Sequence, residues 1–370
     1  MSKQLHLITP TIPYPPNFGG VIDVFYRILA LRKMGVHIYL HCFKYDRDES
    51  EKLENYCEKV FYYDRKLSFL SLFSLTPFIV KTRSNSLLIQ RLNENPFPIL
   101  YDGLHGTYSL IHSDLKQNKF LRPHNVETDY FSQIAKSESN FFRRLFFYAE
   151  HLKLKRYEKK MGLAKVILPI SINDQKYFSK YSESHLIRAF HSNSSVTSQP
   201  GKGTYALYHG NMTISENIKA IQFLMKKVIP YINTPVIFAG KINSKSLVKS
   251  IGKYSNLDLV ENPSHNKMNA LIQNAHIVLL PTFQNTGIKL KLLESLFKGR
   301  LCVANKAMIQ NTELEELCLE VNSPKDWIHV IKEHMGKSFS AAEINKRQRI
   351  LSIFDNEKEA KKIVNIIFNN

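Results

Sequence analysis

The polar residues that follow the buried strand ending at Leu280 could bind a phosphorylated, hydroxyl-bearing ligand. A short loop joins this strand to a predicted helix, and such a loop directs backbone N–H groups and the positive end of the helix toward a ligand above the sheet. Lys289 and Lys291 add positive charge for a diphosphate. Because they lie two residues apart on the predicted helix, we expect their side chains to point in different directions. The Glu294 carboxylate can accept hydrogen bonds from a ribose diol. We therefore predict a nucleotide-sugar site formed by Thr286, Gly287, Lys289, Lys291 and Glu294.

The composition indicates two ordinary cores and a large excess of positive charge. The chain has 370 residues, 44% of them hydrophobic, and a formal net charge of +19. Such a charge attracts phosphorylated ligands, anionic lipid or nucleic acid. Nucleic acid is excluded as a predicted partner because the sequence has no zinc finger, no ribonucleoprotein-type aromatic motif and no separate basic helix. Four scattered cysteines without a C-x-x-C pair are typical of a reducing, cytoplasmic compartment and argue against a zinc site.

One apolar stretch could touch a membrane without crossing it. Residues 67–80 form the longest apolar run, but the run contains Pro77 and falls short of the ~18–20 residues that span a bilayer. It fits either a buried helix with a loop or an interfacial segment that dips into a membrane. Residues 141–147 and 152–156 mix bulky apolar side chains with positive charge. The sequence therefore allows peripheral binding to an anionic membrane surface, on the inner face of the cell membrane.

Strands and helices alternate twice along the chain, which predicts an α/β fold of two Rossmann-like, doubly wound domains. The strands expected in the first half are 5–9, 36–42, 98–101, 119–121 and 165–170, with helices at 21–33 and at 127–161, the latter broken near 137–139. The strands expected in the second half are 205–208, 235–239, 257–260, 276–280 and 301–304, with a helix that Ser215 caps. We place the first domain at 1–190, a polar linker at 191–203, the second domain at 204–340, and a final helix within 341–370 that can pack back on the first domain.

The first half carries its own candidate reactive residues. Gly19 and Gly20 follow the first strand, at the strand end where open sheets bind ligands, and glycine lets the backbone approach a ligand closely. His124 also follows a strand, where an imidazole could contact a transferred sugar or orient an acceptor. We predict His124 and Glu127 as catalytic residues, with His105 as a weaker alternative.

Several motifs resemble the GT-B glycosyltransferases, and the second half looks like their retaining family 4, also called glycosyltransferase group 1. The motifs are Asn-Phe-Gly-Gly at 17–20, His-Asn-Val-Glu at 124–127, Ile-Ser-Ile-Asn-Asp at 170–174, His-Gly-Asn-Met at 209–212, Ala-Gly-Lys at 239–241 and the second glutamate of an E-x7-E pattern at 294. The resemblance implies two domains facing a cleft, with the nucleotide sugar on the second and a glycan or lipid-linked acceptor on the first. It implies retaining transfer without a metal or other cofactor, a Gly19–Gly20 loop for the acceptor or diphosphate, and donor-binding residues at Gly210, Asn211, Lys241, Thr286, Gly287, Ile288, Lys289, Lys291 and Glu294.

The chain departs from the family pattern at three positions. Thr286 stands where the first glutamate of the E-x7-E pattern is usual, and Asn211 and Glu216 replace the usual arginine and lysine after the first strand of the second domain. We expect Lys241, Lys289 and Lys291 to supply the missing positive charge. Two alternatives to a transferase stay open. One is a non-catalytic GT-B paralogue that binds a nucleotide sugar or glycan, which the loss of the first glutamate favours, and the other is a GT-B sugar-nucleotide epimerase.

Overall fold

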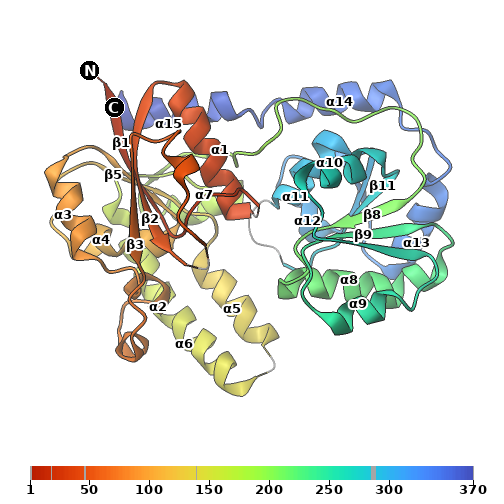
Figure 1. Ribbon diagram of the computed structural model, residues 1–370, viewed down its shortest axis with the longest axis horizontal. Coiled ribbons are helices and arrows are strands. Elements are labelled where there is room, and N and C mark those ends of the chain that lie inside the picture. Colours follow the sequence, from red (N-terminus) through yellow and green to blue (C-terminus); the bar gives the residue numbers. More distant parts are fainter. Residues whose placement is uncertain (1, 18, 46, 139, 285–288, 370) are drawn as a thin grey trace. The chain divides into compact units, whose positions relative to one another are not determined.

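The computed structural model describes residues 2–17, 19–45, 47–138, 140–284 and 289–369 and divides the chain into two compact units. The first unit comprises residues 1–192 and 354–370, and the second comprises residues 193–353. Each unit is built around its own sheet, with helices on its faces (Figure 1). No helix in these described ranges is long and apolar enough to cross a membrane.

The sheet of the first unit is parallel, and its described part has seven strands in the order β3-β2-β1-β4-β5-β6-β7. The chain therefore builds outward from β1 in one direction and then crosses to the other side, as in a doubly wound fold. The strands are β1 (Lys3–Thr9), β2 (Val36–Lys44), β3 (Lys59–Asp64), β4 (Ile99–Asp102), β5 (Lys119–Arg122), β6 (Val166–Ile167) and β7 (Glu183–Ser184).

Alternation along the strands gives this sheet two apolar faces. Leu100 and Phe120 pack with α1 (Gly19–Lys33) and α15 (Asn356–Phe368), while the next residues in sequence, Tyr101 and Leu121, belong to the cluster on the opposite face. Figure 1 shows α15 beside α1, although more than 300 residues separate them in the chain. The remaining helices of this unit are η1 (Glu51–Leu53), η2 (Phe69–Phe73), α2 (Phe78–Lys81), α3 (Ser86–Glu94), η3 (Leu104–Gly106), α4 (Tyr108–His112), α5 (Glu127–Ser137), α6 (Phe141–Tyr157), η4 (Glu158–Leu163) and α7 (Ile172–Phe178).

A chain of hydrogen bonds crosses the first three strands of this unit and fixes the tautomers of two buried histidines. His6 Nε2 lies 2.8 Å from Asn95 O, which can only accept, so His6 Nδ1 accepts from His41 Nε2 at 2.9 Å. His41 Nδ1 then accepts from the Tyr63 hydroxyl at 2.8 Å, and Arg91 Nη1 donates to that hydroxyl at 3.2 Å. Each imidazole accepts a hydrogen bond at Nδ1, so both histidines must be neutral. Burial lowers the pKa of both imidazoles, which favours this neutral state.

The sheet of the second unit is also parallel, with its described strands in the order β10-β9-β8-β11-β12-β13. This is the Rossmann order, 3-2-1-4-5-6 when the strands are counted from β8. The strands are β8 (Ala206–His209), β9 (Val236–Gly240), β10 (Leu257–Glu261), β11 (Ile277–Leu280), β12 (Leu301–Ala304) and β13 (Leu319–Glu320). The helices are α8 (Ser215–Lys227), η5 (Ile229–Tyr231), α9 (Lys245–Ile251), α10 (His265–Asn274), α11 (Leu290–Lys298), α12 (Lys306–Ile309), η6 (Glu315–Leu317), α13 (Pro324–His334) and α14 (Ala341–Leu351).

The predicted fold class, two Rossmann-like doubly wound domains, is confirmed, and several local predictions need correction. The expected final helix is two helices, of which α14 lies in the second unit and α15 in the first. Residues of the predicted linker are held by the second unit. Gly201 forms an isolated antiparallel β-bridge with Phe339, and Arg347 Nη1 donates a hydrogen bond to Ser198 Oγ at 3.0 Å. Ser215 is the first residue of α8 rather than its cap, since the N-cap is Ile214.

Candidate functional site

The second unit has its topological switch point between β8 and β11. These strands are neighbours in the sheet, and the chain leaves them in opposite directions, so a crevice forms beyond their carboxyl ends. His209 ends β8, and Thr282 follows β11. The predicted donor-binding segment begins at this edge, which is where a doubly wound sheet binds its ligand.

Lys289 and Lys291 point toward the same element, so the prediction that they diverge is wrong. Lys289 is the N-cap of α11 in an extended conformation, and its Nζ lies 3.8 Å from Glu216 Oε1 on the first turn of α8. Lys291 Nζ donates to Asn217 Oδ1, the next residue of α8, at 3.0 Å. A residue outside the helix does not follow helical spacing, and this lets both ammonium groups reach one place.

Burial makes the two ammonium groups sensitive to their surroundings. Loss of hydration lowers the pKa of Lys291 to about 8, with Glu216 opposing the shift and Lys289 adding to it. Burial lowers the pKa of Lys289 as well, and Glu216 again opposes it. The Glu216 carboxylate also accepts a hydrogen bond from the Thr282 hydroxyl. Glu216 therefore holds the side chain of Lys289 and favours the charged form of both lysines.

Glu294 lies in α11 and is ionised. Burial alone would raise its pKa, but His209 and Lys298 outweigh that effect and the net shift is downward. Lys298 Nζ lies 3.0 Å from Glu294 Oε1 and donates to Asn269 Oδ1 of α10 at 2.6 Å. The side chain of Glu294 keeps about a quarter of its surface exposed, so its carboxylate can still accept hydrogen bonds from a ligand.

His209 belongs to this site, although we did not predict it as a site residue. Its Nε2 lies 2.8 Å from Ser295 Oγ, and Ser295 Oγ donates to Lys291 O at 2.7 Å. The hydroxyl has one proton, so His209 Nε2 must donate and Nδ1 is left as an acceptor. Burial lowers the pKa of His209 to about 4, against the attraction of Glu294, so the ring is neutral near pH 7.

The other predicted donor-binding residues have different positions. Gly210 lies against the end of β9, where a Cβ on Gly240 would meet Gly210 O at 1.8 Å, so position 240 has room only for glycine. Asn211 shapes its own turn, since its Oδ1 accepts from Thr213 N at 3.0 Å. The Lys241 carbonyl accepts from Met212 N at 2.8 Å, while the exposed Lys241 side chain makes no ion pair or hydrogen bond within the described ranges. Thr286, Gly287 and Ile288 lie outside the described residues.

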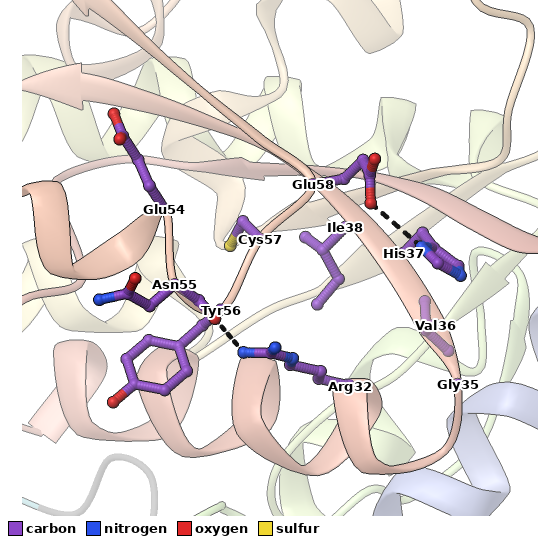
Figure 2. Close-up of a pocket in the computed structure, with 10 residues that line it drawn as sticks. All are labelled: Arg32, Gly35, Val36, His37, Ile38, Glu54, Asn55, Tyr56, Cys57 and Glu58. Atoms are coloured by element: carbon purple, nitrogen blue, oxygen red, sulfur yellow. Dashed lines mark hydrogen bonds and ion pairs between the residues drawn. The ribbon is translucent and has the colours of Figure 1, made fainter.

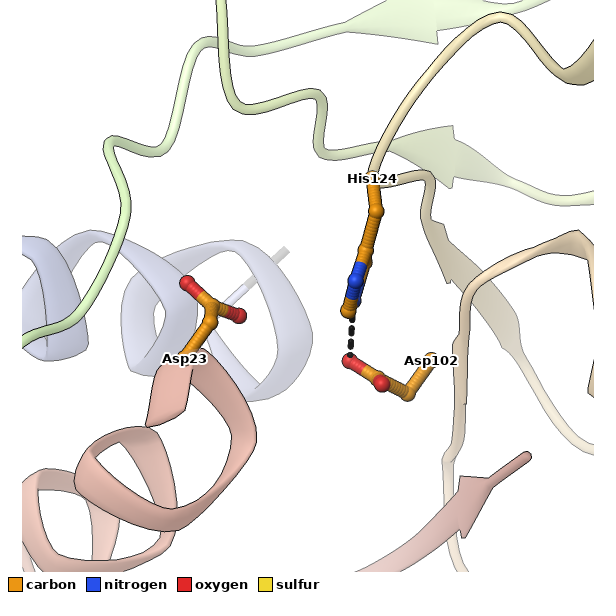
Figure 3. A group of neighbouring side chains, drawn as sticks. All are labelled: Asp23, Asp102 and His124. Carbon is orange, nitrogen blue, oxygen red and sulfur yellow. Dashed lines mark hydrogen bonds and ion pairs between the residues drawn. The ribbon is translucent and has the colours of Figure 1, made fainter. Parts of the chain in front are cut away.

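In the first unit, His124 lies at the carboxyl end of the sheet beside a buried carboxylate. Its Nε2 donates to Asp102 Oδ1, at the end of β4, at 3.1 Å (Figure 3). Burial would lower the pKa of His124, but the attraction of Asp102 and Asp23 outweighs it and the net shift is upward. On the other side of the ring, a Cβ on Gly20 would lie 3.2 Å from His124 Nδ1. The second predicted glycine, Gly19, is the first residue of α1 and has open space beside it.

The Asp102 carboxylate is part of a buried network of opposite charges. Arg27 of α1 pairs with Asp102 and also with Asp23, at 2.9 Å. Arg122 holds both oxygens of Asp23, at 2.7 and 3.0 Å. The pKa of Asp23 is well below its ordinary value, because these arginines outweigh the effect of burial. The network fixes the position of Asp102 and through it the ring of His124.

This cluster is the one group among the described side chains that has the spacing of metal ligands. One atom each from Asp23, Asp102 and His124 lie within 4.8 Å of one another. However, Asp23 already uses both oxygens for arginines, and Asp102 Oδ1 contacts both Arg27 and His124. The guanidinium groups supply the positive charge that a cation would bring, so these residues do not fit a metal site.

Glu127 and the alternative residue His105 lie together. Glu127 is the first residue of α5, and its Oε1 lies 3.6 Å from His105 Nε2. The Glu127 side chain is almost wholly buried, while about a third of the His105 side chain is exposed. The predicted catalytic residues His124 and Glu127 therefore have different partners at the same edge of the sheet. His124 contacts Asp102, and Glu127 lies beside His105.

A surface hollow of about 300 Å³ lies elsewhere in the first unit (Figure 2). It is bounded by the end of α1, the start of β2 and residues 54–58. Arg32 donates to Asn55 O across it, and His37 Nδ1 lies 3.1 Å from Glu58 Oε2. The hollow is at the amino end of β2, whereas the candidate reactive residues follow the carboxyl ends of strands, so it is not part of the candidate site.

The second unit matches a known protein family. Residues 203–336 correspond to the family described as Glycosyl transferases group 1. Over these residues the chain is similar to that family. The matched residues include the switch point, both lysines and Glu294, and the family agrees with the resemblance seen in the sequence.

Solved glycosyltransferase structures share the fold over the whole chain, which confirms the GT-B prediction. A mutant of S. aureus TarM, solved with fondaparinux, alpha-GlcNAc-glycerol and UDP, is 11% identical with a TM-score of 0.68, covering 99% of this chain and 100% of TarM. WaaG, a glycosyltransferase involved in lipopolysaccharide biosynthesis, is 12% identical with a TM-score of 0.65, covering 99% of this chain and 100% of WaaG. An uncharacterized 44.6 kDa protein in the cps region of Klebsiella pneumoniae is 26% identical over 326 residues, which cover 79% of this chain and 80% of that protein.

Proposed function

We propose that this protein is a glycosyltransferase that moves a sugar from a nucleotide-diphosphate sugar to a glycan or lipid-linked acceptor, with retention and without a metal. The observation that carries the proposal is the meeting of Lys289 and Lys291 at the carboxyl edge of the second sheet, within the residues that match the glycosyl transferases group 1 family. Two partly desolvated ammonium groups at one point suit a diphosphate. Glu294, ionised on the same helix, suits the ribose.

The lysines also support the proposed independence from a metal. The negative charge of the leaving nucleoside diphosphate must be stabilised as the bond to the sugar breaks, and positioned ammonium groups can do this. The protein then contributes position and electrostatic stabilisation, and the leaving phosphate itself can take the proton of the acceptor hydroxyl. His124 and Glu127, at the carboxyl edge of the first sheet, are the residues that we assign to the acceptor and the transferred sugar.

The source of the known relatives supports the acceptor class. WaaG is named for lipopolysaccharide biosynthesis, and the Klebsiella protein is named for the cps region. We therefore propose a role in the biosynthesis of a surface polysaccharide, with the reaction in the cytoplasm. Binding to a membrane surface is a separate proposal, which rests on other residues and is described below.

A donor panel tests the activity. The protein is incubated with common UDP-, GDP-, TDP- and ADP-sugars and with polyprenyl-linked glycans, with and without EDTA, and released nucleoside diphosphate and glycosylated product are measured. We expect release that depends on the acceptor, continues in EDTA and gives a product whose anomeric configuration by NMR equals that of the donor. Binding of a donor without product would favour the non-catalytic paralogue. Conversion of the donor into an epimer without an acceptor would favour the epimerase.

A further inference from the structure

Two segments of the first unit expose large apolar side chains. Residues 67–75, which include η2, expose a set of side chains by 68% to 86%: Leu67, Phe69, Leu70, Phe73 and Leu75. The outer face of α6 exposes a second set by 45% to 78%: Phe141, Phe142, Leu145, Tyr148 and Leu152. We call these ten residues the apolar end. Of the two interpretations of residues 67–80, a buried helix with a loop is wrong for the part up to Leu75.

A hydrogen bond and contacts around Phe78 hold the two segments near each other, although some 70 residues separate them in the chain. Lys153 Nζ of α6 donates to Leu72 O at 2.7 Å and pairs with Glu150 Oε1 at 2.8 Å. Glu150 accepts from Phe78 N at 2.6 Å, and the Phe78 ring lies 6.1 Å from that of Phe146. Figure 1 shows the loop before α2 and the amino-terminal end of α6 projecting on the same side of the first unit. Exposed apolar side chains gathered on two neighbouring segments mark a candidate interaction site.

The charged side chains of the two segments that reach solvent are basic, although Arg143 Nε lies 3.1 Å from Glu138 Oε2, just before α6. Between residues 141 and 163 the acidic residues are Glu150 and Glu158, and both are buried. The basic residues of this segment that reach solvent are Arg143, Arg144, Lys155, Arg156, Lys159 and Lys160. Residues 65–81 contain no acidic residue and include Arg65, Lys66 and Lys81. The partner of this surface must therefore be apolar inside and negatively charged where it meets the bases.

An anionic bilayer has both properties. Its acyl chains accept Phe, Leu and Tyr side chains to a depth of several ångströms, and its phosphates attract bases at the same level. Arg143 and Arg144 stand between Phe142 and Leu145 on α6, and their long side chains can keep the guanidinium groups at the headgroups while the apolar neighbours insert. We propose that the apolar end is a membrane-docking surface that inserts into the headgroup region of an anionic leaflet. This proposal does not rest on the proposed transferase activity.

Tryptophan fluorescence tests insertion directly. The chain has one tryptophan, Trp327, which is buried in the second unit, so its signal should not respond to lipid. The Leu70→Trp variant adds a reporter to the apolar end, and Leu87→Trp adds a matched reporter at an exposed position of α3 outside it. With vesicles of 30% phosphatidylglycerol in phosphatidylcholine, we expect a blue shift and quenching by brominated lipid for position 70 alone. Equal responses at positions 70 and 87, or none at either, would overturn the proposal.

Charge reversal tests the contribution of the bases. We expect Lys155→Glu with Arg156→Glu to lower the partition onto these vesicles about 30-fold or more, since each base near an anionic surface contributes ~1 kcal/mol. The matched control, Lys226→Glu with Lys227→Glu on α8, makes the same charge change at exposed positions of the second unit and should change the partition little. Equal losses would show a net-charge effect and overturn the docking surface.

Removal of apolar side chains separates a bilayer from a protein partner. The Phe69→Ser and Leu70→Ser double variant should lower binding to anionic vesicles at least tenfold, without changing the circular dichroism spectrum or the ability to bind nucleoside diphosphate. In sedimentation equilibrium without lipid, the wild type should have the mass of a monomer. Self-association that the double variant abolishes, together with unchanged vesicle binding, would assign the apolar end to a second copy of the chain instead.

Discussion

His124 Nε2 donates to Asp102 Oδ1 at 3.1 Å, and the carboxylate of Asp102 is wholly buried. The same carboxylate pairs with Arg27, so its charge is fixed within a network that also holds Asp23 and Arg122. The imidazole is thereby kept in one orientation, with Nδ1 toward Gly20, and its charged form is favoured. In this charged form His124 donates a hydrogen bond from Nδ1 and cannot accept a proton there.

We predict that His124→Ala lowers kcat strongly and leaves donor affinity nearly unchanged. An interaction made mainly in the transition state lowers turnover rather than binding, and the predicted nucleotide contacts lie in the other unit. Turnover and the dissociation constant of the donor without acceptor should be measured in the same preparation. Near-normal turnover of a folded variant would leave His124 structural and direct attention to His105 and Glu127.

Asp102→Asn should change the pH dependence of turnover in a defined direction. Asp102 raises the pKa of His124, so its neutralisation lowers that pKa. If the imidazolium is the active form, activity is lost as the pH rises through its pKa, and the variant loses activity at a lower pH than the wild type. Loss of one partner of a buried ion pair also costs stability, about 3–5 kcal/mol, so unfolding is followed in parallel. A uniform loss of activity at all pH values would point to a structural role alone.

Glu294→Ala should weaken nucleoside binding about tenfold or more, because a charge-assisted hydrogen bond contributes ~1.5–3 kcal/mol. The loss of the Lys298 ion pair is an alternative cause, and Lys298→Met separates the two. That variant removes the pair and keeps the carboxylate, so it should bind nucleoside much better than Glu294→Ala. Calorimetry with the bare nucleoside and with its 2′,3′-dideoxy analogue checks the ribose contact. The analogue lacks the diol, so the wild type and Glu294→Ala should bind it equally weakly.

Lys289→Met and Lys291→Met should each cost about tenfold or more in affinity for a nucleoside diphosphate and little for the nucleoside. Because the pKa of Lys291 is about 8, wild-type affinity for the diphosphate should fall as the pH rises past that value, while affinity for the nucleoside should not. Lys226→Met is the matched control, since it removes one exposed ammonium group of the same unit that is not among the predicted donor-binding residues. Parallel losses for both ligands would argue against contact with the phosphates.

The sequence predicted the central strands because they are short apolar runs followed by glycine or polar loops. It did not predict β3, β7 or β13. Strand β3 lies at an edge and is only half-buried, and the other two are two residues long. Such strands depend on a neighbour for their hydrogen bonds more than on their own side chains.

The side-chain contacts of the site could not be predicted from the sequence, because they join residues that are far apart in the chain. His209 meets Ser295, 86 positions away, and Arg122 meets Asp23, 99 positions away. The directions of Lys289 and Lys291 depend on where α11 begins, and helix ends are difficult to place from sequence alone. Residue types at the edge of the sheet were therefore predictable, and their partners were not.

The buried histidines of the first unit should make it less stable at acid pH. In the folded chain the pKa of His41 is well below its ordinary value, and the pKa of His6 is lowered as well. As the pH falls below ~6.5, the unfolded chain takes up protons that the folded chain cannot, so the free energy of unfolding decreases, by about 1.4 kcal/mol for each fully neutral histidine between pH 7.5 and 5.5. His41→Gln removes this contribution, whereas His37→Gln, at an exposed histidine on the same strand, keeps it. Denaturant unfolding followed by circular dichroism, with Trp327 fluorescence reporting the second unit separately, measures the difference. If the wild type and His41→Gln lost the same stability between the two pH values, the hydrogen-bond chain from Arg91 to Asn95 would not depend on neutral histidines.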